Sequence, residues 1–173
     1  EEQTVDEKEI WAVLEVALKE ACENFVESRI TEGERLKEDL FDKLDGMIKD
    51  VDAIENRYPQ IMAEYREKLT MKVEELLGDA QMEEGRIAAE VILFADKICT
   101  DEETVRLRSH IESMREELLS GGSVGRKLDF LAQEMNREAN TILSKANDLE
   151  TSNRAINLKT EIEKVREQIQ NIE

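Results

Sequence analysis

Apolar side chains return at intervals of three and four residues along nearly the whole chain, and this spacing constrains the fold more than any other feature of the sequence. Residues spaced in this way share one face of an α-helix. No segment alternates between apolar and polar residues for long enough to predict a β-strand, and proline occurs once. The sequence therefore predicts an all-α fold, with more than about 70% of its residues in helices.

The N-terminal part of the chain contains two sequence signals for a helix start. Thr4 with Glu7 has the spacing of a capping box, in which a threonine and a glutamate satisfy each other's free backbone N–H groups. Thr31 with Glu34 has the same spacing, and Gly33 between them is compatible with a bend as well as with a break. Together with the apolar residues spaced by three and four along this part of the chain, these signals predict either one long helix or an extended helical hairpin.

Pro59 suits the first turn of a helix better than its interior, because proline has no backbone N–H. A further helix is therefore expected to begin there, and Gly78 would close it. We expect residues 1–78 to form a long helical arm or bundle.

Residues 79–173 predict a compact helical domain. After a helix that ends near residue 98, Thr100 and Glu103 have the capping-box spacing and predict the start of the next one. The glycine cluster at 121–125 lacks the Lys-Ser/Thr ending of a phosphate-binding loop and predicts a turn between helices. The last two helices are expected to pack as an antiparallel hairpin.

The charge and the cysteines limit the class of protein. A net charge of -18 excludes nucleic-acid binding through bulk positive charge, so any RNA contact must be a local patch. Cys22 and Cys99 lie far apart without metal-ligand spacing, which predicts two reduced, mostly buried thiols. No apolar run approaches the length of a membrane span. We expect a soluble, cytoplasmic protein and, because the chain starts at Glu1 and not at Met, part of a longer gene product.

Three polar residues share one face of the helix that follows residue 100, namely Glu103, Arg106 and His110. His110 is the only histidine, and its ordinary pKa suits proton transfer near neutral pH. The alternative is a solvated helix face with an intrahelical ion pair. One histidine and two isolated cysteines cannot build a tetrahedral zinc site of nitrogen and sulfur ligands within the chain.

Carboxylates are the metal ligands that the chain does have. Glu134 with Glu138, and Glu163 with Glu167, are each separated by one helical turn, and antiparallel packing of their helices could bring the pairs together. Hard oxygen ligands favour Mg²⁺ or Mn²⁺. Among 42 acidic residues, however, many such pairs arise by chance on exposed faces.

Amide and basic residues could contact RNA in the same C-terminal region. One polar stripe consists of Asp129, Gln133, Asn136 and Asn140. Its side chains could form hydrogen bonds with RNA, or they could pack against other polar groups of the protein. A basic flank consists of Arg126, Lys127, Arg137 and Lys145. These side chains could bind phosphate groups of RNA, or they could form intrahelical ion pairs.

The C-terminal residues closely resemble the signature of the YicC-like bacterial endoribonuclease family. The resemblance rests on GRKLDFL at 125–131, QEMNREANT at 133–141, and Ser144-Lys145. Two further blocks are similar to the same family, Arg106-Leu107 with Ser109-His110-Ile111, and REQIQNIE at the end of the chain. The dense part covers about residues 90–173, and family members carry an additional N-terminal domain that is missing here.

The resemblance implies a metal-dependent endoribonuclease that assembles as a ring-like homohexamer around RNA. His110 would then move a proton beside Glu103 and Arg106, while Mn²⁺ or Mg²⁺ binds the carboxylates at 134, 138, 163 and 167. RNA would be bound by Arg126, Lys127, Arg137, Asn140 and Lys145. Neither DNA nor a membrane is expected as a partner. The alternative is a helical oligomerisation or RNA-binding module that does not cleave, which the acidity and the heptad-like spacing of the final helix allow.

Overall fold

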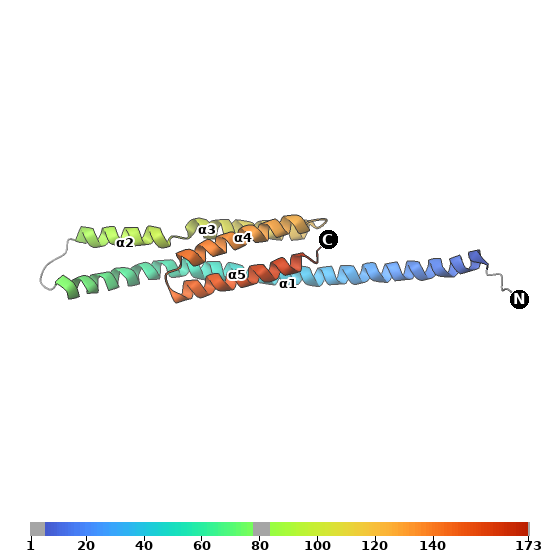
Figure 1. The fold of residues 1–173 in the computed structure, drawn as a ribbon, viewed down its shortest axis with the longest axis horizontal. Coiled ribbons are helices and arrows are strands. Elements are labelled where there is room, and N and C mark those ends of the chain that lie inside the picture. The colour runs from blue at the N-terminus through green and yellow to red at the C-terminus, as the bar shows by residue number, and fades with distance from the viewer. Residues whose placement is uncertain (1–5, 78–83, 173) are drawn as a thin grey trace. The chain divides into compact units, whose positions relative to one another are not determined.

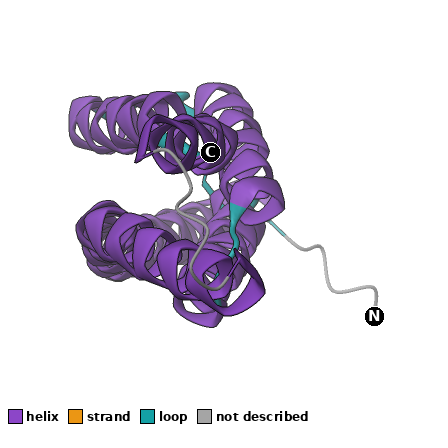
Figure 2. Ribbon diagram, turned by 90° about the vertical axis from the view of Figure 1, so that its left-hand side faces the viewer, coloured by secondary structure: helices purple, strands orange, loops and turns teal. Residues whose placement is uncertain are grey.

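The computed structural model describes residues 6–77 and 84–172, and 92% of these residues are helical. Figure 2 shows helices and loops, and no strand, in this part of the chain. The helices are α1 (Glu7–Leu77), α2 (Glu84–Ile98), α3 (Asp101–Ser120), α4 (Gly125–Lys145) and α5 (Leu149–Ile169) (Figure 1). The predicted all-α fold is confirmed.

The stripes of the N-terminal part form one helix, α1, and not a hairpin. Asp6 precedes it and accepts a hydrogen bond from the Lys8 backbone N–H at 3.0 Å. Thr31 lies inside the helix, where its hydroxyl donates to the Glu27 carbonyl at 3.0 Å, so the capping box predicted at Thr31 does not form. Thr4, at the other predicted capping box, lies outside the described residues.

Pro59 lies inside α1, so the prediction that a new helix begins there is wrong. The helix on both sides of the proline is fixed by tertiary contacts. Ile54 and Ile61 are buried, and the Tyr58 hydroxyl donates to the Ala95 carbonyl of α2 at 3.2 Å. These contacts offset the backbone hydrogen bond that proline cannot make. Gly78, the predicted end of this helix, lies outside the described residues.

The chain divides into two compact units between Asp39 and Leu40, which we call the N-terminal unit and the C-terminal unit. This division differs from the boundary predicted after residue 78. The reason is that the core of the C-terminal unit begins within α1, where Leu40, Leu44 and Met47 are fully buried.

In the N-terminal unit, nine large apolar side chains are between 46% and 73% exposed. They are Ile10, Trp11, Val13, Leu14, Val16, Leu18, Phe25, Val26 and Ile30. Cys22 is also exposed, so its predicted burial is wrong, while Cys99 of the C-terminal unit is half-buried.

The C-terminal unit is built from the part of α1 that starts at Leu40 together with the other helices. In this unit α4 packs against both α3 and α5, and α4 and α5 form the predicted antiparallel hairpin (Figure 1). The apolar seam of α5 is buried here, with Leu158, Ile162 and Val165 at 0% exposure. That seam therefore stabilises the fold of a single chain.

Ion pairs join α1 to α3 and α5. The buried Asp50 carboxylate accepts hydrogen bonds from Arg154 at 2.9 Å and from Asn157, both on α5. Arg108 of α3 donates to Glu55 at 2.7 Å and also contacts Asp52. These contacts fix the register of α1 against its neighbours.

The turns of the C-terminal unit follow the sequence in part. Gly121 and Gly122 have φ angles of 66° and 83°, a conformation that favours glycine, and they form the predicted turn between α3 and α4. Thr100 occupies the predicted N-cap of α3 but makes no capping hydrogen bond through its side chain. Glu103, its expected partner in the capping box, binds other residues.

Candidate functional site

Glu103 is a buried carboxylate in the first turn of α3, only 5% exposed. Lys145, the last residue of α4, donates to its two oxygens at 3.0 and 3.1 Å and to the Cys99 carbonyl at 2.9 Å. Arg106, one turn further along α3, donates to Glu103 at 3.3 Å. One buried acid thus holds two cations from different helices.

Arg106 extends this network to α4. Its Nε donates to Glu138 at 2.9 Å and its Nη1 to Glu102 at 3.1 Å. These hydrogen bonds, and first the one that Arg106 donates to Glu138, raise the pKa of the Arg106 guanidinium, which therefore stays charged. Glu138 is buried, whereas the Arg106 side chain is 46% exposed. The guanidinium is therefore fixed and still reachable from solvent.

The antiparallel register of α3 and α4 places His110 beside the same network. Arg106 meets Glu138, and Glu117 binds Lys127 nearer the turn that joins the two helices. With this register the turn of α4 opposite the half-buried His110 contains Glu134. Glu134 in turn accepts a hydrogen bond from the exposed Arg137 at 2.8 Å.

Seven of the predicted site residues thus lie along one pair of helices, and we call this surface the α3–α4 face. Its members are Glu103, Arg106, His110, Glu134, Arg137, Glu138 and Lys145. Arginine and lysine can donate hydrogen bonds to phosphate oxygens, and a neutral imidazole can accept a proton. The face therefore combines fixed cations with an acid-base group.

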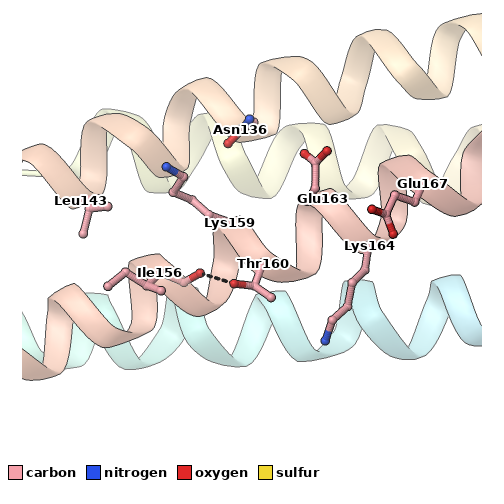
Figure 3. Close-up of a pocket in the computed structure, with 8 residues that line it drawn as sticks. All are labelled: Asn136, Leu143, Ile156, Lys159, Thr160, Glu163, Lys164 and Glu167. Carbon is pink, nitrogen blue, oxygen red and sulfur yellow. Dashed lines mark hydrogen bonds between the residues drawn. The ribbon is translucent and has the colours of Figure 1, made fainter.

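A groove of about 540 Å³ lies on the other side of α4, between α4 and α5, and we call it the α4–α5 groove. Glu163 and Glu167 of α5 and Asn136 of α4 line it together with Lys159 (Figure 3). The Asn136 Oδ1 atom is shielded from solvent and has no hydrogen-bond partner within the described residues. The groove therefore offers oxygen atoms that a ligand could use.

The four carboxylates predicted to bind metal are divided between these two places. Glu134 and Glu138 face arginines, whereas Glu163 and Glu167 line the α4–α5 groove. Within residues 6–77 and 84–172, no cluster of three or more His, Cys, Asp or Glu side chains could hold a metal ion. The two groove carboxylates and the Asn136 oxygen are nevertheless the hard donors that Mg²⁺ and Mn²⁺ prefer.

The remaining predicted RNA-binding residues lie at different points on α4. Arg126 is exposed in the first turn and has no ion-pair partner among the described residues, while Lys127 binds Glu117. Asn140 is exposed. Asp129 accepts hydrogen bonds from Arg166 at 3.0 Å and from Gln133 at 2.7 Å, so this end of the amide stripe makes internal contacts.

Sequence reasoning missed the Cys99 carbonyl as an acceptor and the unpartnered oxygen of Asn136. A backbone acceptor has no sequence signal, and the link between Glu103 and Lys145 spans 42 residues. The spacing of Glu103 from Thr100 predicted a capping box and so obscured this link. None of the helices in the described ranges has the length and apolar character needed to cross a membrane.

Comparison with known proteins connects these residues to one family. Residues 54–173 match the family model described as "Endoribonuclease YicC-like, C-terminal". A protein of Clostridioides difficile (strain 630) named "Probable endoribonuclease YicC" is 42% identical over 174 residues, which cover 100% of this chain and 59% of that protein. A protein of Haemophilus influenzae with the same name is 36% identical over 157 residues, covering 91% of this chain and 54% of that protein. The chain thus spans little more than half the length of these relatives, and it belongs to the YicC-like endoribonuclease family.

Proposed function

We propose that this chain contributes the RNA-cleaving part of a divalent-metal-dependent endoribonuclease. The observation that carries the proposal is the α3–α4 face, on which a buried carboxylate holds Arg106 and Lys145, and the only histidine of the chain follows one helical turn after Arg106. The names of the two relatives support the same reaction class.

In this proposal Arg106 and Arg137 bind the phosphates on either side of the bond that is cleaved. Both guanidinium groups are partly exposed and keep N–H donors on the solvent side. His110 accepts or donates the proton that the reaction moves. Glu103 does not touch RNA, because Lys145 and Arg106 occupy it, and it acts as a positioning residue. Further RNA is bound along α4 by Arg126, Lys127 and Asn140.

The divalent metal, Mn²⁺ or Mg²⁺, would be held by Glu163 and Glu167 together with the Asn136 oxygen. These side chains fit because no ion pair within 4.0 Å is formed by either carboxylate among the described residues, whereas Arg137 and Arg106 bind Glu134 and Glu138. When bound, such an ion polarises a phosphodiester and lowers the pKa of its water.

The chain is further proposed to act in the cytoplasm as a homo-oligomer, a hexamer or a trimeric half of one. The α5 seam cannot be the interface, because it is buried within the C-terminal unit. The exposed apolar side chains of the N-terminal unit are the better candidates, since burying them between copies would be favourable.

A second candidate function is RNA binding without cleavage. It is favoured by one observation, namely that Glu103 and Glu138 each bind a cation, as in an ion-pair network that only stabilises a fold. In that case the α3–α4 face would bind RNA, and His110 would have no chemical role.

A nuclease assay on the purified chain separates the two functions. We expect cleavage of RNA with Mn²⁺ and none in excess EDTA. His110→Ala and Glu167→Gln should each lower the rate about a hundredfold. Glu112→Gln, an exposed carboxylate of α3, is the control and should cleave at the normal rate. Cleavage that persists in EDTA would remove the metal, and RNA binding with no cleavage would favour the second function.

A further inference from the structure

The N-terminal unit contains a short heptad pattern on an exposed helix. Trp11, Leu14, Leu18, Ala21 and Phe25 alternate at spacings of three and four residues, and we call them the arm seam. The four large side chains of the arm seam are between 46% and 66% exposed. This spacing is that of the contact positions of a coiled coil, so the surface fits another helix.

We propose that the arm seam pairs antiparallel with the arm seam of a second copy of the chain. This inference rests on the homo-oligomer proposed above and assigns its interface. The arm seam lies in a helix that extends beyond it on both sides, so pairing does not have to nucleate the helix.

The sizes of the seam residues favour the antiparallel orientation. In antiparallel coiled coils the first contact position of one heptad faces the fourth position of the partner. Leu18 then meets the partner's Ala21, Phe25 meets the partner's Leu14, and Trp11 meets the partner's Ser28. Each layer thus joins a larger side chain to a smaller one, as close packing requires.

A parallel pair would pack less well. It would place Trp11 against the partner's Trp11 and Phe25 against the partner's Phe25, while two alanines at position 21 would leave a gap between them. Crowded and empty layers would alternate, and both are unfavourable.

The charges next to the arm seam are compatible with the antiparallel pair. The flanking positions bring Glu15 beside the partner's Cys22 and Ala17 beside the partner's Asn24, so no two like charges meet in the middle of the seam, and only Lys8 and the partner's Arg29 face each other at its ends. The acidic residues Glu20, Glu23 and Glu27 lie on the outer side of the helix.

The area is sufficient for a specific but weak contact. Each copy would bury roughly 500 Å² of apolar surface from Trp11, Leu14, Leu18 and Phe25, so about 1,000 Å² in all, which is near the lower limit for a stable interface. We therefore expect the assembly to dissociate on dilution.

Two matched variants test whether the arm seam is the interface. Leu18 and Val13 are both exposed apolar residues of the same helix, but only Leu18 lies in the seam. By light scattering, the unmodified chain should be an oligomer, Leu18→Glu should lower its mass at least twofold, and Val13→Glu should leave the mass unchanged. A monomeric unmodified chain, or equal masses for the two variants, would overturn the proposal.

A disulfide test settles the orientation and does not depend on how the glutamate variants fold. In a chain with Cys99→Ser, the change Glu15→Cys should give a covalent dimer on oxidation through Cys22 of the partner subunit. The change Glu20→Cys, on the outer side, should give none. No covalent dimer with Glu15→Cys would exclude the antiparallel register. The nuclease assay on the same samples reports separately on RNA cleavage, so either proposal can fail alone.

Discussion

At the scale of single residues, Glu103 shows how the structure changes the meaning of a candidate catalytic group. Its carboxylate is buried and accepts hydrogen bonds from Lys145 and Arg106. A carboxylate whose two oxygens already accept hydrogen bonds from two cations has little room to contact a substrate. Its contribution is to fix the two cations, and that contribution should be visible in the stability of the fold.

Glu103→Ala should lower the free energy of unfolding by about 2 kcal/mol, because it leaves Lys145 partly buried without its acid. The midpoint and slope of urea unfolding measure this change. Glu102→Ala removes an exposed partner of Arg106 and should cost less than about 0.5 kcal/mol. Equal effects of the two changes would show that burial of Glu103 contributes nothing.

Stability should fall in acid through the carboxylates around Arg57. Hydrogen bonds from Arg57 lower the pKa of Glu64, and those from Thr151 and Arg57 lower the pKa of Asp148 although its burial opposes this shift. Because both pKa values are lower in the folded chain, the stabilisation is complete above about pH 5 and is lost as the pH falls through the folded values. In Arg57→Gln this loss between about pH 5 and 2 should be smaller in urea unfolding, and an unchanged pH profile would contradict the assignment.

At the scale of helices, the sequence predicted elements whose signals are local. The α4–α5 hairpin follows from apolar periodicity, and the turn between α3 and α4 follows from Gly121 and Gly122. The interior of α1 was not predictable, because Pro59 and Thr31 are common at helix starts and only tertiary contacts keep the helix continuous. Local preference is a weak guide where packing decides.

Pro59→Ala should stabilise the chain, because alanine restores a backbone N–H in the middle of α1 and removes the ring that crowds the preceding turn. An increase of about 1–3 kcal/mol in the free energy of unfolding is expected from thermal or urea unfolding. Gly46→Ala, at an open position of the same helix, should give only about 0.5–1 kcal/mol. A destabilising Pro59→Ala would mean that the proline fixes a bend that the fold needs.

At the scale of the whole molecule, the candidate site was predictable as a set of residues but not as an arrangement. Arg106 and His110 were predicted to lie together because they share a helix face, and this needs no tertiary information. Glu138 faces α3 on one side of α4, whereas Glu163 of α5 lines the groove on the other side. This arrangement depends on which side of α4 each neighbouring helix packs. The sequence of one chain contains no direct signal for that choice.

The core predicts where the chain can be shortened. A chain of residues 40–173 should unfold cooperatively, whereas a chain of residues 54–173, the range of the family match, should not. The shorter chain lacks Leu40, Leu44, Met47 and Val51, which are all fully buried. Each loss costs about 2–5 kcal/mol, and the four losses together are as large as the whole free energy of unfolding of a typical domain. Thermal unfolding followed by circular dichroism measures this, and a sharp transition in the shorter chain would contradict it.

The ion pair of Asp50 with Arg154 also has a consequence for biosynthesis. Asp50 is made before its partner Arg154, which follows 104 residues later. Because translation proceeds at about 5–20 residues per second, α5 is synthesised roughly 5–20 s after the part of α1 that it covers. The helices α3, α4 and α5, whose contacts are close in sequence, can assemble as each one emerges. Within the C-terminal unit α1 is therefore the helix that is made first and completed last, and during that interval its uncovered apolar face is the surface that a chaperone would bind.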